Sequence, residues 1–139
     1  MTYFADLTPY AYLPSSVPPG VRALNVGWLE AGRPFTFGRP PEHFTERLGL
    51  LCRDQPRARS MGLHACDQPH PSGGPLVPVY ADIGGESVML GTAEVRVVSA
   101  TGEWLVAPTL VHHYVTHHGY LPPPDFVEAV LAGRVAGEV

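Results

Sequence analysis

Two cysteines and two histidines lie close together in the middle of the chain and form a possible set of metal ligands. Cys52, His64, Cys66 and His70 follow one another in the pattern Cys-x11-His-x-Cys-x3-His. Two thiolates and two imidazoles suit the tetrahedral, borderline-soft preference of Zn²⁺. Alternatively, both cysteines are buried structural residues and both histidines lie at the surface. A nucleophilic Cys66 beside His64 is a weaker hypothesis, because no third residue is placed to orient the pair. The spacing matches no common zinc finger, but the residue types predict a zinc site here.

A second group of histidines lies nearer the C-terminus, within residues 112–118. Here His113 and His117 are four residues apart, the helical separation of paired metal ligands, but Tyr114 stands where the zincin motif requires a glutamate. At 100° per residue, His118 shares the apolar side of the helix with Tyr114, and His113 lies at its border. We therefore expect His113, Tyr114 and His118 to be the residues that a pocket can use. We expect His112 and His117 to be exposed. The alternative is that His117 and His118, in the last turn, only help to satisfy free carbonyls.

Charge and composition exclude some classes of partner. All nine basic residues are arginine and the formal net charge is −4, which argues against sequence-independent binding of nucleic acid. Four arginines cluster in the second half of the first predicted helix and the start of the loop after it, namely Arg47, Arg53, Arg57 and Arg59. A solvated helix end and loop explains this cluster, and an anion-binding role is the alternative.

The length and hydropathy of the chain indicate one packed domain, residues 1–139. Apolar residues make up 45% and charged residues 16% of the sequence, so a buried core is expected. No apolar run approaches the ~20 residues that cross a bilayer, and the first residues lack the features of a secretory signal. We expect a cytoplasmic protein with no membrane association. Two cysteines in a reducing compartment are a poor basis for a disulfide.

The first half of the chain is predicted to contain one strand and one helix. Residues 1–20 are rich in proline and tyrosine and should be irregular but packed on the domain. Alternation predicts a strand within residues 21–29, with Trp28 facing the core. Apolar residues at i, i+4 and i+7 predict a helix over residues 41–53. Residues 54–75 have no periodicity and are predicted to form a long loop. Loops of this length are usually functional, disordered, or held in place by something other than a core, such as a metal site.

The second half reads as a β-meander followed by two helices. Alternating residues predict strands within residues 77–83, 88–90, 93–97 and 103–107, with Trp104 facing the core and Glu94 and Arg96 on a wet face. Short helices are expected after Pro108 and after the Pro122–Pro124 run. The predicted fold class is α+β: an antiparallel sheet of about five strands with three helices, one after the first strand and two at the C-terminus.

Several strings of the chain resemble a family of short uncharacterised proteins from Streptomyces and related actinobacteria. The resemblance rests on an N-terminal MTYFADLTPY segment, NVGWL, HAC, AEVRV, APTL and a C-terminal HYV..HGY.PP motif, so it covers nearly the whole chain. Members of this family carry His-x-Cys-x-x-Cys in the long loop, which implies a zinc site with the upstream cysteine. This sequence keeps His64 and Cys66, has Pro69 in place of the last cysteine, and offers His70 one position further on. The resemblance implies no activity.

These observations predict a small binding or accessory protein with a structural zinc site in its long loop. Its partner would be a protein or a small molecule that the sequence does not identify. The alternative is a small metal-dependent enzyme that uses the region of His113 and His118. The two differ in coordination, because a structural zinc has four protein ligands whereas a catalytic metal keeps one position open for water.

Overall fold

The computed structural model describes residues 3–59 and 62–137, and it has the α+β composition that the sequence predicts. Three helices and five strands are present in these ranges, with a short 3-10 turn at Pro14–Ser16. The strands are β1 (Ala23–Asn25), β2 (Val79–Ile83), β3 (Glu86–Leu90), β4 (Glu94–Val98) and β5 (Trp104–Pro108). The helices are α1 (Phe44–Asp54), α2 (Val111–His118) and α3 (Pro124–Ala132). Among the described residues, none of these helices has the length and hydropathy needed to span a bilayer.

The strands form two sheets instead of the single antiparallel sheet that alternation suggested. One sheet has the order β1-β5-β4, and the other is the β2–β3 hairpin. Strands β4 and β5 are antiparallel, but β1 pairs in parallel with β5, so that Leu24 lies opposite Leu105. Alternation reports which residues share a face and carries no information about which strand pairs with which. The parallel pair therefore could not be predicted from the alternation alone.

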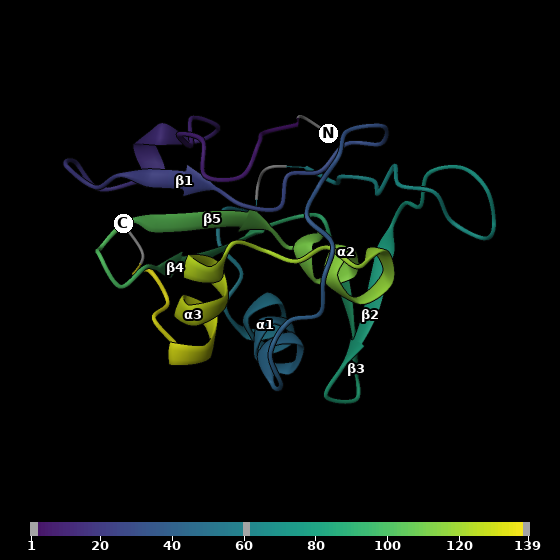
Figure 1. The fold of residues 1–139 in the computed structure, drawn as a ribbon. Helices are drawn as coiled ribbons and strands as arrows, with labels where there is room; N and C mark the ends of the chain where they lie inside the picture. Colours follow the sequence, from purple (N-terminus) through teal and green to yellow (C-terminus); the bar gives the residue numbers. More distant parts are fainter. Residues whose placement is uncertain (1–2, 60–61, 138–139) are drawn as a thin grey trace.

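Both faces of the three-stranded sheet are buried. Helices α1 and α3 lie on one side, where they pack on Val95, Val97 and Leu105 in the main core. The N-terminal segment lies on the other side and forms a second small core around Tyr10, Trp28 and Val106 (Figure 1). The segment pairs with the free edge of β1, where the Tyr10 amide donates to the Ala23 carbonyl at 2.9 Å. It then crosses the face of the sheet.

This second core contains an ion pair that we expected to be exposed. Glu94 is fully buried and Arg96 is 5% exposed, although both were predicted on a wet face. The Arg96 guanidinium donates to the Glu94 carboxylate at 2.7 Å, and the Tyr10 hydroxyl donates to the same carboxylate at 2.7 Å. The prediction was wrong because the irregular N-terminal segment covers this face, which strand alternation does not reveal.

Both tryptophans are buried, as predicted. Trp28 is 1% exposed and Trp104 is 8% exposed. The Trp28 indole also donates its N–H to the Val106 carbonyl at 3.0 Å, and its ring lies edge-on to Phe4 with the ring centres 5.6 Å apart. The side chain thereby joins the strand segment after β1, strand β5 and the N-terminal segment.

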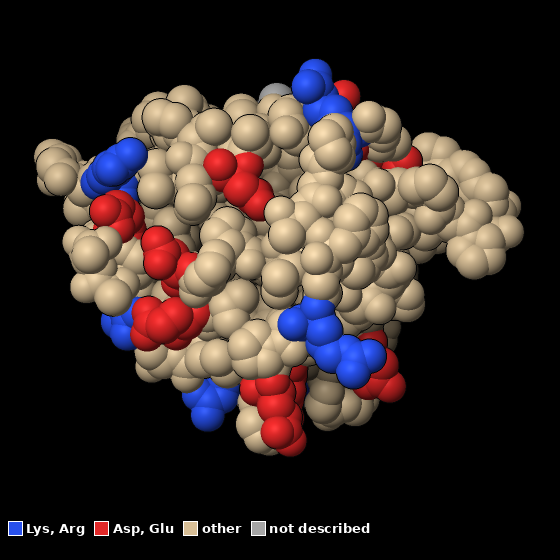
Figure 2. Space-filling model, in the orientation of Figure 1, with Lys and Arg blue, Asp and Glu red and all other residues tan. Residues whose placement is uncertain are grey.

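The long stretch between α1 and β2 projects from the body of the molecule. It appears as the teal loop beyond the upper end of β2 in Figure 1. Residues 68–78 contain no charged residue, and the corresponding lobe in Figure 2 is free of acidic and basic side chains on the face shown. The loop has little regular structure, but backbone contacts hold its first part to the body: Arg57 forms a bridge with Glu94 of β4, and the His64 amide donates to the Gly91 carbonyl at 2.8 Å. Cys66 pairs with Leu76 within the loop itself.

We expect Trp28→Ala to lower the free energy of unfolding by about 3–5 kcal/mol, because the change empties a buried ring site and leaves the Val106 carbonyl without its donor. Urea denaturation followed by circular dichroism measures this loss. The control is Phe37→Ala, at a ring that is 70% exposed, with an expected loss below about 1 kcal/mol. Equal losses in the two variants would contradict the proposed role of Trp28 in joining the second core.

Candidate metal centre

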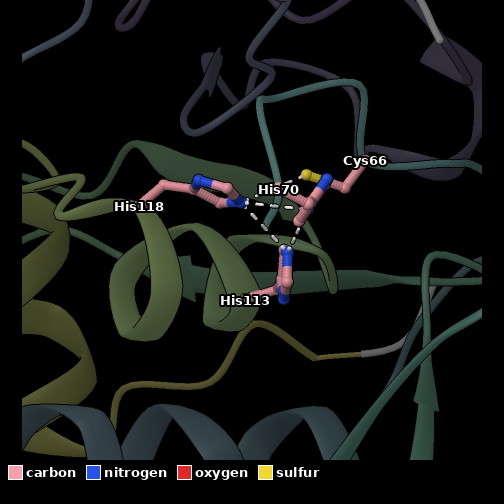
Figure 3. A group of neighbouring side chains, drawn as sticks. All are labelled: Cys66, His70, His113 and His118. Carbon is pink, nitrogen blue, oxygen red and sulfur yellow. Dashed lines mark hydrogen bonds between the residues drawn. The ribbon is translucent and has the colours of Figure 1, made fainter. Parts of the chain in front are cut away.

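Four metal-ligating side chains from two separate segments meet beside α2. Cys66 and His70 come from the long loop, whereas His113 and His118 come from α2. The Cys66 Sγ and one nitrogen of each histidine all lie within 4.8 Å of one another. Figure 3 shows the four side chains pointing toward a common centre. This group, which we call the Cys66 cluster, can hold a metal ion.

The three imidazoles of the cluster meet through their Nε2 atoms. These atoms are 3.3 Å apart between His70 and His113, 3.3 Å between His70 and His118, and 3.2 Å between His113 and His118. A ring nitrogen of neutral histidine is either a donor or an acceptor, so among three mutually adjacent nitrogens at least two are of the same kind. Hydrogen bonds alone cannot satisfy this triangle. A cation at its centre would satisfy all three lone pairs.

The distances also match those of a tetrahedral zinc site. Zinc–nitrogen bonds of about 2.0–2.1 Å place neighbouring nitrogens about 3.3 Å apart, and a zinc–sulfur bond of about 2.3 Å places sulfur about 3.6 Å from each nitrogen. The three nitrogens match the first value, and the Cys66 Sγ lies 3.5 Å from the His118 Nε2. One face of the tetrahedron and the edge from Cys66 to His118 are therefore already formed.

The environment of the cluster favours neutral imidazoles. Cys66 is fully buried and His113 is 4% exposed, whereas His70 and His118 are partly exposed. Burial, together with the neighbouring histidines, lowers the pKa of His113 to about 4 and also lowers the pKa of His118. Burial raises the pKa of the Cys66 thiol, so this group would release its proton when it binds a metal. The His70 Nδ1 lies 3.3 Å from the Gly74 carbonyl, a contact that places its proton on Nδ1 and leaves Nε2 free to bind a cation.

The local sequence explains how α2 presents its two ligands. The helix ends at His118 because Gly119 adopts a left-handed conformation with φ of 70° and caps it, as expected for a glycine at this position. His113 and His118 are five residues apart and therefore leave the helix about 140° from each other, but their ring nitrogens converge on one point. His117, which we expected to be exposed, is exposed; it lies outside the cluster, and its ring stacks on His113 with the centres 4.8 Å apart.

The cluster differs from the ligand set expected from the sequence. Of that set, Cys66 and His70 are brought together, whereas Cys52 and His64 lie outside the cluster. Cys52 is buried in α1, where its Sγ lies 3.8 Å from the Thr109 carbonyl and burial raises its pKa to about 12. His64 is tied by its backbone amide to the Gly91 carbonyl and is not part of the cluster.

The three residues of α2 that we expected to line a pocket do not all reach the same site. His113 and His118 belong to the cluster, while Tyr114 is fully buried in the main core. His112, which we expected to be exposed, is 8% exposed, and its ring packs against Gly49 of α1. The prediction for His112 was wrong because α1 and the β2–β3 hairpin cover that side of α2.

Comparison with known families places the chain among proteins without an assigned role. A family model described as a domain of unknown function, DUF7919, matches residues 2–131. The chain belongs to this family. All four residues of the Cys66 cluster lie inside the matched DUF7919 segment. The match agrees with the expected resemblance to an uncharacterised family. No curated protein and no solved structure matches the chain.

We expect the metal-free DUF7919 chain to lose stability as the pH falls from about 6.5 toward 4. His113 has its pKa lowered from 6.5 to about 4 in the folded state, so over this range the unfolded chain binds a proton that the folded chain does not. Above about pH 6.5 His113 is unprotonated in both the folded and the unfolded chain, so its protonation no longer reduces the free energy of unfolding. Urea titrations of chelator-treated protein at several pH values measure the slope, which should be smaller in His113→Gln. An unchanged slope in that variant would assign the pH dependence to other groups.

Proposed function

We propose that the chain is a small accessory protein of the cytoplasm in which the Cys66 cluster is a structural zinc site. The observation that carries this proposal is the triangle of three Nε2 atoms with a thiol beside it. One soft thiolate and three imidazoles suit zinc, whereas calcium and magnesium prefer oxygen ligands. Both cysteines are free thiols, a state that the reducing cytoplasm preserves.

Zinc at this position would fasten the long loop to the body of the protein. The loop contributes Cys66 and His70, while His113 lies 43 positions beyond His70 in α2. The backbone links from the described part of the loop to the body are the Arg57–Glu94 bridge and the His64–Gly91 contact, both before Cys66, whereas the Cys66–Leu76 pairing lies within the loop. Because the ligands converge only in the folded chain, the free energy of metal binding adds to the free energy of folding.

The number of ligands favours a structural site over a catalytic one. Four protein side chains fill a tetrahedral coordination sphere, and no position is left for a water or a substrate. The partial exposure of His70 and His118 favours the alternative, a small metal-dependent enzyme, because an exposed ligand can detach and open a position. The two functions are therefore separated by the coordination of the bound metal.

We expect protein purified without a histidine tag to contain about one zinc per chain. Removal by a strong chelator should lower the melting temperature by about 10 °C, which corresponds to roughly 3 kcal/mol for a chain of this size. Elemental analysis and thermal denaturation measure both effects.

Two matched pairs of variants make this experiment specific. Cys66→Ser and His118→Ala should lose the metal, whereas Cys52→Ser and His117→Ala should retain it, since the latter residues lie outside the cluster. Loss of zinc from Cys52→Ser with retention in His118→Ala would contradict the proposed ligand set. Wild-type protein that contains no metal and melts identically with and without chelator would contradict the site itself.

Cobalt substitution separates the structural function from the catalytic one. We expect Co²⁺ in the cluster to give the intense visible bands of a four-coordinate site with a thiolate ligand, unchanged by added azide or cyanide. A catalytic site with an open position would bind these anions and change its spectrum. The control is His70→Ala, which opens one position deliberately and should make the spectrum sensitive to the added anion.

A further inference from the structure

A cavity of about 600 Å³ lies between α3 and the segment that leads into α1. Its described walls consist of one arginine, one glutamate and seven proline or aliphatic residues. We call this cavity the α3 pocket. Its volume is within the range of small-molecule sites, about 300–1,000 Å³, and such sites are mostly apolar with a few polar groups that orient the ligand.

Helix α3 contributes an apolar stripe to the pocket in addition to the face that it buries in the core. Phe126 and Val130 point into the main core. The helix residues that line the pocket include four spaced i, i+3, i+4 and i+7, which places them along one side, namely Pro124, Val127, Glu128 and Leu131. Pro124 is exposed and Leu131 is only partly buried. The stripe is therefore an apolar surface that the core leaves partly open.

Backbone pairing holds the opposite wall in place. The Gly38 amide donates to the Gly119 carbonyl at 3.1 Å, and the Leu121 amide donates to the Thr36 carbonyl at 2.8 Å. This pairing keeps the segment that carries Arg39 beside the connection from α2 to α3. Three of the lining residues are prolines, whose φ angles are fixed. The walls are therefore largely preformed, and a ligand loses little affinity in ordering them.

The pocket offers a single unpaired positive charge. Arg39 is exposed at its mouth, and no hydrogen bond or ion pair joins the guanidinium to another described residue. Glu128, the one acidic residue of the described wall, forms an ion pair with Arg134, which offsets its charge from outside the pocket. What is left is one cation beside an apolar surface.

This combination selects a small monoanion with an apolar body. The planar fork of arginine donors matches the two oxygens of a carboxylate. A phosphate monoester carries about −1.5 to −2 charges at pH 7 and would leave charge unpaired against an apolar wall. None of the described lining residues is aromatic, so the walls are suited to an aliphatic chain and not to the stacking of a flat ring.

We propose that the α3 pocket binds a medium-chain aliphatic carboxylate. The carboxylate pairs with the Arg39 guanidinium at the mouth, and the chain lies between Leu121 and the stripe of α3 that includes Val127 and Leu131. The pocket shares no residue with the Cys66 cluster, so this proposal does not depend on a bound metal.

Titrations followed by ¹H–¹⁵N NMR test the proposal with three probes: octanoate, 1-octanol and acetate. Octanoate should bind saturably with millimolar affinity, as expected for a ligand of this size, and should shift the amide resonances of α3 and of residues 38–39. 1-Octanol should shift the same α3 resonances, because it has the same chain. Acetate should leave them unchanged, because a carboxylate without a chain has only the exposed Arg39 to bind.

Two variants with matched controls examine the charge and the apolar wall separately. Arg39→Ala should weaken octanoate binding about fivefold and leave 1-octanol binding unchanged, since only octanoate uses the ion pair. Its control is Arg33→Ala, at an arginine that pairs with Glu30 outside the pocket. Ala132→Trp should fill the pocket and weaken both ligands at least tenfold, whereas Ala100→Trp, outside the pocket, should bind as the wild type does. Both alanines are exposed, so melting temperatures should not change.

Several results would overturn the proposal. One is the absence of saturable octanoate binding at millimolar concentration, and another is wild-type affinity in Ala132→Trp. An equal ratio of octanoate to 1-octanol affinity in Arg39→Ala and the wild type would remove the ion pair. Octanoate shifts confined to residues around the Cys66 cluster would place the carboxylate at the metal. Shifts of the α3 resonances with protein concentration, and not with octanoate, would assign this face to a second copy of the chain. The expected pattern of variants supports the pocket whether or not the zinc proposal holds.

Discussion

The contact of three histidine nitrogens is the constraint on which the centre of this protein depends. Atoms of this kind, about 3.3 Å apart, repel one another or remain unsatisfied unless a cation lies between them. The fold nevertheless brings them together, from a projecting loop and from the end of α2. The last turn of α2, which Gly119 caps, positions His118, and the Cys66–Leu76 pairing positions Cys66, so that both ligands reach the same point. A bound zinc would turn this repulsion into the strongest link between the loop and the body.

The buried ion pair of Glu94 and Arg96 has a comparable place on the other side of the sheet. Taking two charges out of water is costly, and the pair is tolerated here because Tyr10 and Ser16 provide further hydrogen bonds. These partners belong to the N-terminal segment, which has almost no regular structure of its own. The network therefore fixes an irregular segment on the sheet.

The stretch between α1 and β2 connects the edge of β4 with the candidate metal centre. Its first residues pair with β4 through Arg57 and Glu94, and its later residues, Cys66 and His70, form half of the Cys66 cluster. Backbone bridges to β4 and to the turn after β3 fasten it between these points. A loop of this length without helix or strand is uncommon in a compact protein unless it carries a function. The proposed zinc site accounts for its length, because the stretch must supply Cys66 and His70 to the metal.

The sequence by itself determined the elements of the protein and most of its reactive residues. Period-2 and period-3.6 patterns identified the strands, the three helices and the burial of Trp28 and Trp104, because these patterns arise from local backbone geometry. Residue chemistry identified Cys66, His70, His113 and His118 as able to bind a metal, but in two separate groups. Only the tertiary structure decided that they form one cluster without Cys52 and His64, that β1 runs parallel to β5, and that Glu94 is buried. Each of these outcomes depends on contacts between segments far apart in the chain, which local periodicity and spacing do not encode.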